Sequence, residues 1–304
     1  KLESLKTVAF LVICNDSVRQ EHYWRGYGPE SVTNSFSVSK SLVGMLVGVA
    51  LKEGKIKSLD QPVGDFLPAF KEGEKSKITI RHLLTMSSGL NWDESYSNPL
   101  SMTTEAYYGT DLKSLIKRLE VEAEPGKAFF YKSGNTQLLS FILQAATGMD
   151  LSDYAAKKIW TPLGAEQPAE WSLDKKGGQE KAYCCLYSNA RDFARLGQLY
   201  LNNGIWNGDT LVPPAYVQAS VTPTNLPDKP TGAPAGFYGY HWWILPEYKG
   251  LKVYYAWGLL GQYIVVIPEL RTVVVRLGEK AGEKRGMHLQ LAYDLVDAGL
   301  AGCK

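Results

Sequence analysis

The chain of 304 residues is long enough to bury a core without disulfides, and its 33 Lys and Arg residues nearly balance its 31 Asp and Glu residues. This balance, with no long basic run, argues against nucleic acid and anionic membranes as partners. No apolar stretch approaches the ~20 residues of a membrane-spanning helix, so no transmembrane segment is predicted. The spacing of Cys14, Cys184, Cys185 and Cys303 fits no metal site, and we expect ordinary thiols that pack as small hydrophobic side chains.

The start of the chain has the pattern of a sheet followed by a buried helix. Residues 7–14 and 18–24 are β-branched and aromatic, with an Asn-Asp pair between them, and they predict a hairpin. From Ser41 the pattern becomes that of a long apolar helix. Its Gly44 and Gly48 lie four residues apart and would allow close packing against a neighbouring element.

Mostly helical segments follow as far as about residue 190. They are expected over residues 79–86, 112–121, 136–147 and 152–159, with one more helix over 192–202. The Pro-rich run 213–234 is typical of a long surface loop.

Strand patterns return near the end of the chain. The expected strands cover residues 238–245, 251–256, 262–267 and 272–277. Turn residues separate them, so they predict an antiparallel meander, which a helix over 287–298 would cover. The order of elements predicts an α+β fold. Residues 1–58 and 191–304 would form an α/β sheet domain with helices on its faces, 59–190 an inserted mostly helical domain, and the active site would lie between them.

The spacing S-x-x-K occurs three times, whereas the nucleophile-elbow, zinc-protease, dinucleotide and Walker patterns do not occur. Ser114 with Lys117 lies within a charged helix pattern, and Ser172 with Lys175 lies in a polar turn region. Both pairs are therefore interpreted as parts of a solvated surface.

The third pair, Ser37 and Lys40, lies where a predicted strand gives way to the apolar helix. The unsatisfied N–H groups at a helix start favour negative charge, and burial would lower the pKa of Lys40 toward that of a general base. The alternative for Ser37 is an ordinary N-cap serine beside a lysine. Further along, Tyr131, Ser133 and Asn135 fall on a predicted turn before the next helix, where the Tyr131 phenol is either a packing residue or a proton relay.

Several blocks of the chain resemble successive motifs of the β-lactamase-related serine hydrolases, which are penicillin-binding-protein-like, and in particular the branch of class C β-lactamases and 6-aminohexanoate-dimer hydrolase. These blocks are SVSKSLVGMLVGVALKEGKIKSLDQPVGDFLP, ITIRHLLTMSSGLNWDE, PGKAFFYKSGNTQLLSFILQAATG, ARDFARLGQLYLNNGIWNGDTLVPP, YGYHWW and AWGLLGQYIVVIP. They run in family order across nearly the whole chain. The resemblance implies a serine β-lactamase/transpeptidase-like fold.

The resemblance also implies roles for individual residues. Ser37 would be acylated, Lys40 would deprotonate it, and Tyr131 would pass a proton to the leaving group and help to activate the deacylating water. Ser133 would hydrogen-bond the lysine or the substrate. The N–H groups of Ser37 and Leu259 would form the oxyanion hole.

The chain departs from the antibiotic-directed members at Ala256-Trp257-Gly258, where those enzymes carry Lys-Thr-Gly or His-Thr-Gly. Gly258 would let the strand approach the substrate, but the cation and hydroxyl that suit a β-lactam carboxylate are missing. We therefore do not expect efficient penicillin hydrolysis.

Aromatic residues and histidines complete the candidate site. Trp92 and Tyr96 are expected to line the cleft and favour an apolar or amide-bearing substrate. The Trp242-Trp243 pair is interpreted as packing. The four histidines form no recognisable triad and are expected to be structural or surface residues; they are His22, His82, His241 and His288.

The sequence thus predicts a serine hydrolase that forms an acyl-enzyme on Ser37 and cleaves an ester or amide. A D-alanyl peptidase and a non-catalytic module that binds peptidoglycan or another ligand are the alternatives. No cofactor and no metal are predicted, and the expected partner is a small ester, amide or peptide-like substrate. The oligomeric state is not predicted. The resemblance alone suggests a periplasmic or otherwise extracytoplasmic location.

Overall fold

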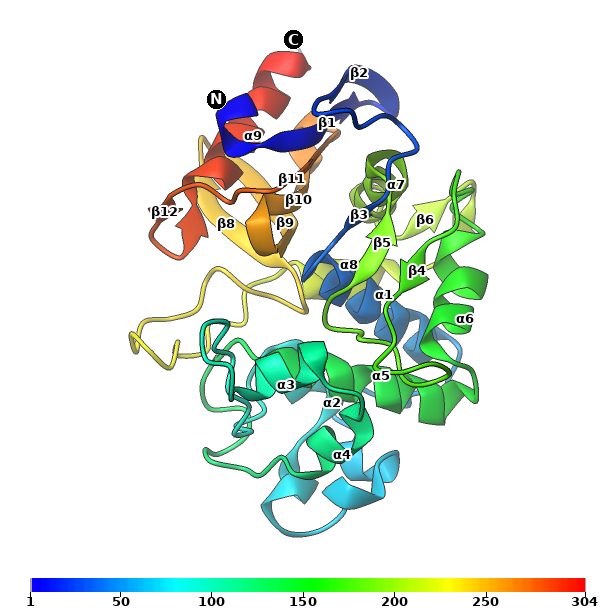
Figure 1. Cartoon of the computed structure of the whole chain (residues 1–304), viewed down its shortest axis with the longest axis vertical. Helices are drawn as coiled ribbons and strands as arrows, with labels where there is room; N and C mark the ends of the chain where they lie inside the picture. Colours follow the sequence, from blue (N-terminus) through cyan, green and yellow to red (C-terminus); the bar gives the residue numbers. More distant parts are fainter. Residues whose placement is uncertain (1, 304) are drawn as a thin grey trace.

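A computed structural model describes residues 2–303 and shows a sheet part and a mostly helical part (Figure 1). The sheet is antiparallel, with the strand order β2-β1-β11-β10-β9-β8. Its strands are β1 (Thr7–Cys14), β2 (Ser17–Tyr23), β8 (Trp243–Tyr248), β9 (Leu251–Gly258), β10 (Gln262–Ile267) and β11 (Thr272–Gly278). The predicted hairpin and meander are confirmed. Since β1 pairs with β11, both ends of the chain build one sheet.

Helices cover both faces of this sheet. On β11, Val273 and Val275 belong to the core cluster that includes α1 (Val38–Lys52) and α7 (Ala190–Leu201). The side chain between them points the other way and packs with α9 (Gln290–Gly302). Burial on both faces explains why β11 is buried along its whole length and contains three consecutive valines, Val273–Val275, rather than an alternating pattern.

The helical part packs against α1. Its helices are α2 (Ile80–Leu84), α3 (Met102–Tyr108), α4 (Leu112–Lys117), α5 (Ser133–Thr147), α6 (Leu151–Ala155), which continues as a π-helical turn over Ala156–Trp160, and α8 (Pro214–Ser220). Helix α1 is buried on all sides, and it contacts α5. A Cβ at Gly48 would lie 2.6 Å from Cδ1 of Tyr216, so the predicted close packing is confirmed.

Short strands connect distant parts of the chain. They are β3 (Thr33–Asn34), β4 (Glu170–Trp171) and β5 (Leu186–Ser188), and the hairpin strands β6 (Ile205–Trp206), β7 (Asp209–Thr210), β12 (Lys284–Arg285) and β13 (His288–Leu289). Pairing of β3 with β5 holds the segment before Ser37 against residues that follow it by about 150 positions. Within residues 2–303, no helix has the length and apolar character needed to cross a membrane.

Three predictions about local structure were wrong. The Pro-rich run contains helix α8, because proline is well accommodated in the first turn of a helix. Helix α5 begins at Ser133, so Ser133 and Asn135 lie in its first turn rather than before it. The cysteines are not free thiols: Cys14 is bonded to Cys303, and Cys184 to its neighbour Cys185.

Candidate active site

Ser37 is presented by a sharp turn between β3 and α1. Phe36 has a φ of +46°, in the left-handed region that is uncommon for a bulky residue. The side chain of Asn34 holds this turn by accepting a hydrogen bond of 2.8 Å from the Phe36 N–H. Ser37 makes no side-chain capping bond to α1, so it is not an ordinary N-cap serine. No acceptor for its N–H is found among residues 2–303.

Lys40 lies one turn into α1 and is almost completely buried. Its Nζ donates a hydrogen bond of 2.9 Å to Oγ of Ser37 and one of 2.6 Å to the carbonyl oxygen of Tyr183. Burial lowers the pKa of Lys40 to about 8, although the nearby carboxylate of Glu94 acts in the opposite direction. A large fraction of Lys40 is therefore neutral near pH 8 and able to accept a proton from Ser37.

Tyr131 faces this pair from the segment just before α5. Nζ of Lys40 lies 5.2 Å from the centroid of the Tyr131 ring, and the Tyr131 hydroxyl interacts with the side chain of Ser37. Burial, and then the charge of Glu94, raise the pKa of Tyr131 well above its ordinary value of 10.0. The phenol therefore keeps its proton at neutral pH. Packing against Trp243, 5.6 Å away between ring centroids, fixes the ring.

A carboxylate that the sequence interpretation missed organises the other wall of the site. Glu94 accepts hydrogen bonds of 2.6 Å from the backbone N–H of Ser133, from Oγ of Ser133 and from the hydroxyl of Tyr96. Its N–H contact is at the start of α5, where negative charge is favourable. Ser133 is thus held by Glu94 rather than by Lys40.

The two aromatic residues expected to line the cleft separate in the structure. Tyr96 lines it. Trp92 lies beneath it, 1% exposed, with its Nε1 donating a hydrogen bond to Thr103. Its ring packs on the backbone of Gly134, where a Cβ would lie 2.4 Å from the indole. Its role in the structure is support of α5, because the apolar ring finds its partner in the core.

Gly258 and Leu259 lie at the end of β9, opposite Ser37. A Cβ at Gly258 would come within 2.2 Å of the carbonyl oxygen of Ser35, so only glycine allows this approach. Leu259 follows on an exposed turn that lines the cleft. The guanidinium of Arg276, fully buried, donates hydrogen bonds of 2.9 and 2.8 Å to the carbonyl oxygens of Leu260 and Gly261. The hydrogen bonds from the buried Arg276 therefore fix the turn that carries the Leu259 N–H.

The buried guanidinium predicts a stability difference between two arginines. Replacing Arg276 by Met leaves the carbonyl oxygens of Leu260 and Gly261 without their donor, and we expect the free energy of unfolding to fall by about 3 kcal/mol or more. The same change at Arg271, whose ion pair with Asp16 is exposed, should cost less than about 1 kcal/mol. Denaturant titration of both variants measures the difference. Equal losses would contradict a supporting role for Arg276.

Ser37, Tyr131, Tyr96 and Gly258 line one cleft of about 610 Å³. Its lining is largely aromatic, and it comprises Phe36, Ser37, Tyr96, Thr103, Thr104, Tyr107, Tyr108, Tyr131, Ser133, Tyr183, Cys184, Trp243, Trp257, Gly258, Leu259 and Lys284. Of the Trp pair interpreted as packing, Trp243 lines the cleft and Trp242 is packed against Tyr200. Neither of the other S-x-x-K serines lines it, and Ser114 instead donates to the side chain of Asp111.

No histidine among residues 2–303 lines this cleft. His241 is buried between Oγ1 of Thr136 and the carbonyl oxygen of Leu84. Burial, followed by the charge of Lys40, lowers the pKa of His241 to about 3, so the ring stays neutral. His82 closes the capping box at the start of α2.

The cleft, the Ser37–Lys40 pair and the fold define a class of protein. The beta-lactamase family model matches residues 2–297, and the chain belongs to this family of β-lactamase-like serine hydrolases. The α+β prediction and the resemblance to this fold are both confirmed.

Individual relatives are similar over most of the chain. The 6-aminohexanoate-dimer hydrolase of Paenarthrobacter ureafaciens is 27% identical over 293 residues, which cover 91% of this chain and 74% of that protein. The solved structure "Putative 6-aminohexanoate-dimer hydrolase from Bacillus anthracis" has a TM-score of 0.86 at 25% identity and covers 99% of this chain and 80% of its own. The octameric penicillin-binding protein homologue from Pyrococcus abyssi shares the fold, with a TM-score of 0.73 at 22% identity, over 99% of this chain and 74% of its own.

Proposed function

We propose that the protein is a hydrolase that forms an acyl-enzyme on Ser37. The observation that supports this proposal most directly is the 2.9 Å hydrogen bond between Nζ of the buried Lys40 and Oγ of Ser37, which lines the cleft. In the proposed first step, neutral Lys40 takes the proton of Ser37 while Oγ attacks the carbonyl carbon of an ester or amide. The N–H groups of Ser37 and Leu259 stabilise the oxyanion.

In the second half of this step, the leaving group needs a proton. Tyr131 supplies it, because its hydroxyl contacts Ser37 and stays protonated at neutral pH. Lys40 then returns the proton that it took from Ser37 to the phenolate. A water molecule, activated by the same tyrosine and lysine, attacks the acyl-serine ester and releases the acid.

The cleft favours a small or linear substrate with apolar segments. Tyr107, Tyr108 and Trp257 contribute much of its wall, and such rings bind alkyl chains and amide faces. Among the relatives, one is named for hydrolysis of a 6-aminohexanoate dimer, which supports a linear amide as one candidate. Ala256 stands where β-lactam-directed members have a cation, so penicillins should be poor substrates.

Labelling with a serine-directed fluorophosphonate tests this proposal. We expect intact-mass measurement to show one adduct, and peptide mapping to place it on Ser37. Folded protein with no adduct would contradict the proposed nucleophile. Turnover of p-nitrophenyl esters, linear amides, D-Ala-D-Ala peptides and nitrocefin then defines the substrate class. Release of D-alanine would identify a D-alanyl peptidase, and ligand binding without turnover would identify a binding module.

We also propose an extracytoplasmic location. Its support is the pair of disulfides, because disulfides persist in oxidising compartments and are rare in the cytoplasm of mesophiles.

The charge of Glu94 gives a prediction with a defined sign. Glu94 raises the pKa of Lys40, so Glu94→Gln should lower that pKa and move the acidic midpoint of kcat/KM below about 8. More neutral lysine would then be present at pH 7. Glu74→Gln, an exposed carboxylate paired with Lys77, should leave the midpoint unchanged. A midpoint that moves upward in Glu94→Gln would contradict this account of the electrostatics.

A further inference from the structure

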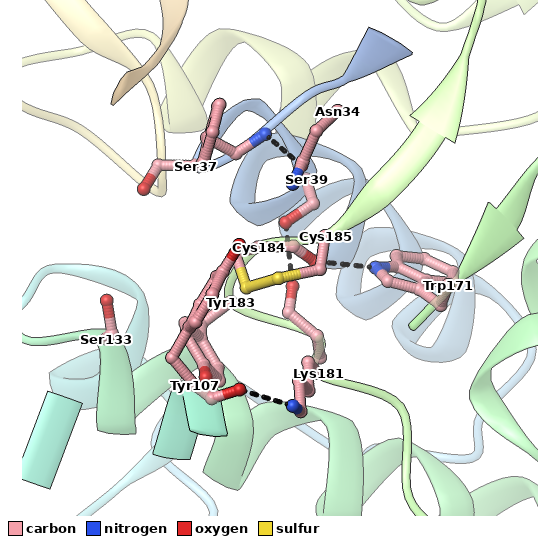
Figure 2. Close-up of a disulfide and its surroundings, with 12 residues drawn as sticks. Asn34, Ser37, Ser39, Tyr107, Ser133, Trp171, Lys181, Tyr183, Cys184 and Cys185 are labelled. Carbon is pink, nitrogen blue, oxygen red and sulfur yellow. Dashed lines mark hydrogen bonds between the residues drawn. A yellow bond between two sulfur atoms is a disulfide. The ribbon is translucent and has the colours of Figure 1, made fainter. Parts of the chain in front are cut away.

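The disulfide between the adjacent residues Cys184 and Cys185 lies in the wall of the cleft. It follows Tyr183, whose carbonyl oxygen accepts the 2.6 Å hydrogen bond from Nζ of Lys40. Figure 2 shows the disulfide with Tyr183, Ser39 and Trp171 around it. The Tyr183 carbonyl and Oγ of Ser37 are the two hydrogen-bond partners of the Lys40 Nζ among residues 2–303.

The backbone on both sides of this disulfide is anchored. Before it, Ala182 accepts a hydrogen bond of 2.9 Å from Oγ of Ser39 and donates one of 3.1 Å to the side chain of Gln137. After it, the carbonyl oxygen of Leu186 in β5 accepts a hydrogen bond of 2.8 Å from the N–H of Ser35. The stretch between these anchors therefore sets where the Tyr183 carbonyl points.

Within that stretch, Cys185 has a φ of +66°. A residue other than glycine in this left-handed region is uncommon and strained. The ring closed by two bonded neighbours restricts the backbone torsions between them. The indole N–H of Trp171 also holds the turn, through a hydrogen bond of 3.1 Å to the Cys184 carbonyl (Figure 2). Backbone hydrogen bonds also hold the segment, from the Ser172 N–H to the Cys185 carbonyl (3.0 Å) and from the Cys184 N–H to the Lys181 carbonyl (3.1 Å). Without the ring, the left-handed backbone of Cys185 is no longer enforced, and the peptides between these bonds can shift.

We propose that the Cys184–Cys185 disulfide is a positioning element for Lys40, and that its reduction by a dithiol slows acylation of Ser37. This inference rests on the proposed function. The reductant donates two electrons and two protons, the Sγ–Sγ bond breaks to give two thiols, and the dithiol becomes a disulfide. Cys184 and Cys185 are both at most 5% exposed, but Cys184 lines the cleft, so a small dithiol has access from the substrate side.

Displacement of the carbonyl has two consequences for the lysine. Lys40 loses the contact that aims its Nζ at Ser37, and a misplacement of about 1 Å in a reacting group lowers the rate roughly 100-fold at most. Water entering beside Lys40 also removes part of the burial that depresses its pKa. The acidic midpoint should therefore rise toward the ordinary lysine value.

The rate of fluorophosphonate labelling of Ser37 across pH tests the proposal. Treatment of the full chain with dithiothreitol should slow labelling roughly tenfold and raise its acidic midpoint, and reoxidation with diamide should restore both. Alkylation and peptide mapping identify which cysteines are reduced. Cys14→Ala/Cys303→Ala removes the remote disulfide and should keep both the fast rate and the response.

Two paired variants separate positioning from folding. Cys184→Ala/Cys185→Ala should be slow and insensitive to dithiothreitol, with the raised midpoint. Cys184→Ala/Cys185→Gly should recover part of the rate, because glycine adopts positive φ without penalty. If the alanine pair does not fold, the reduced Cys14→Ala/Cys303→Ala protein provides the same test.

Two negative results have different meanings. An unchanged rate and midpoint, with Cys184 and Cys185 shown to be alkylated, would overturn the positioning role. Absence of any Ser37 adduct in the oxidised protein would instead overturn the proposed function, and the inference with it.

Discussion

Ser37→Ala should abolish hydrolysis of every substrate that the wild-type protein turns over. Removal of the nucleophile from a serine hydrolase lowers kcat by roughly 10⁴- to 10⁶-fold, because the remaining groups can only bind and polarise the substrate. Oγ of Ser37 is the acceptor of the Lys40 hydrogen bond, so the loss should fall on kcat rather than on KM. Steady-state kinetics on the best ester of the panel measures it.

Ser114→Ala is the matched control for this variant. Ser114 has the same S-x-x-K spacing to Lys117, but its hydroxyl donates to Asp111 on an exposed helix start. We expect wild-type kinetics from Ser114→Ala. Comparable activity of Ser37→Ala and Ser114→Ala would show that Ser37 is not the nucleophile.

Lys40→Met should lower the rate of acylation by roughly 10²- to 10⁴-fold, the usual contribution of general acid–base catalysis. Methionine is close in length and suits the buried position, whereas it cannot accept the proton of Ser37. Lys117→Met is the control and should label and hydrolyse normally. Single-turnover labelling of Ser37 measures both, and circular dichroism checks that each variant is folded.

The pH profile of the wild-type protein tests the same residue. Because burial lowers the pKa of Lys40 to about 8, the protonated and inactive form dominates below that pH. We expect kcat/KM to fall about tenfold per pH unit below about 8 and to level off above it. In Lys40→Met this limb should disappear. A profile with its midpoint near 6.5 would instead indicate a histidine base.

The parts of the site that are local in sequence were predictable. Ser37 and Lys40 are three residues apart at the start of one apolar helix, so helix geometry alone brings them together. The β-branched and aromatic runs near the chain ends, separated by turn residues, likewise predicted the strands of the large sheet. Tyr131 was placed by the resemblance to the family rather than by any local rule.

The parts that depend on tertiary contacts were not predictable. Glu94 is an ordinary loop carboxylate in the sequence, and it becomes part of the site because α5 presents the Ser133 N–H to it. The Tyr183 carbonyl reaches Lys40 across 143 positions of the chain. Trp92 has the sequence context of a loop aromatic suited to recognition, but its ring is buried against Gly134.

The cysteines show the same limit in two ways. Cys14 and Cys303 are 289 positions apart, and their pairing follows from the sheet that brings both chain ends together. Cys184 and Cys185 are neighbours, and this adjacency was a signal that the comparison with metal-binding spacings overlooked. The left-handed backbone of Cys185, which accompanies the bond between the two neighbours next to the cleft, is visible only in the structure.

Direct observation of the acyl-enzyme tests the central claim. The wild-type protein is mixed with an activated ester, quenched in acid within the first turnover, and measured by intact mass and peptide mapping. The proposed chemistry predicts a mass increase of one acyl group, located on Ser37, that decays as the acid product is released. Hydrolysis of the ester without any acylated Ser37 in the first turnover would contradict it.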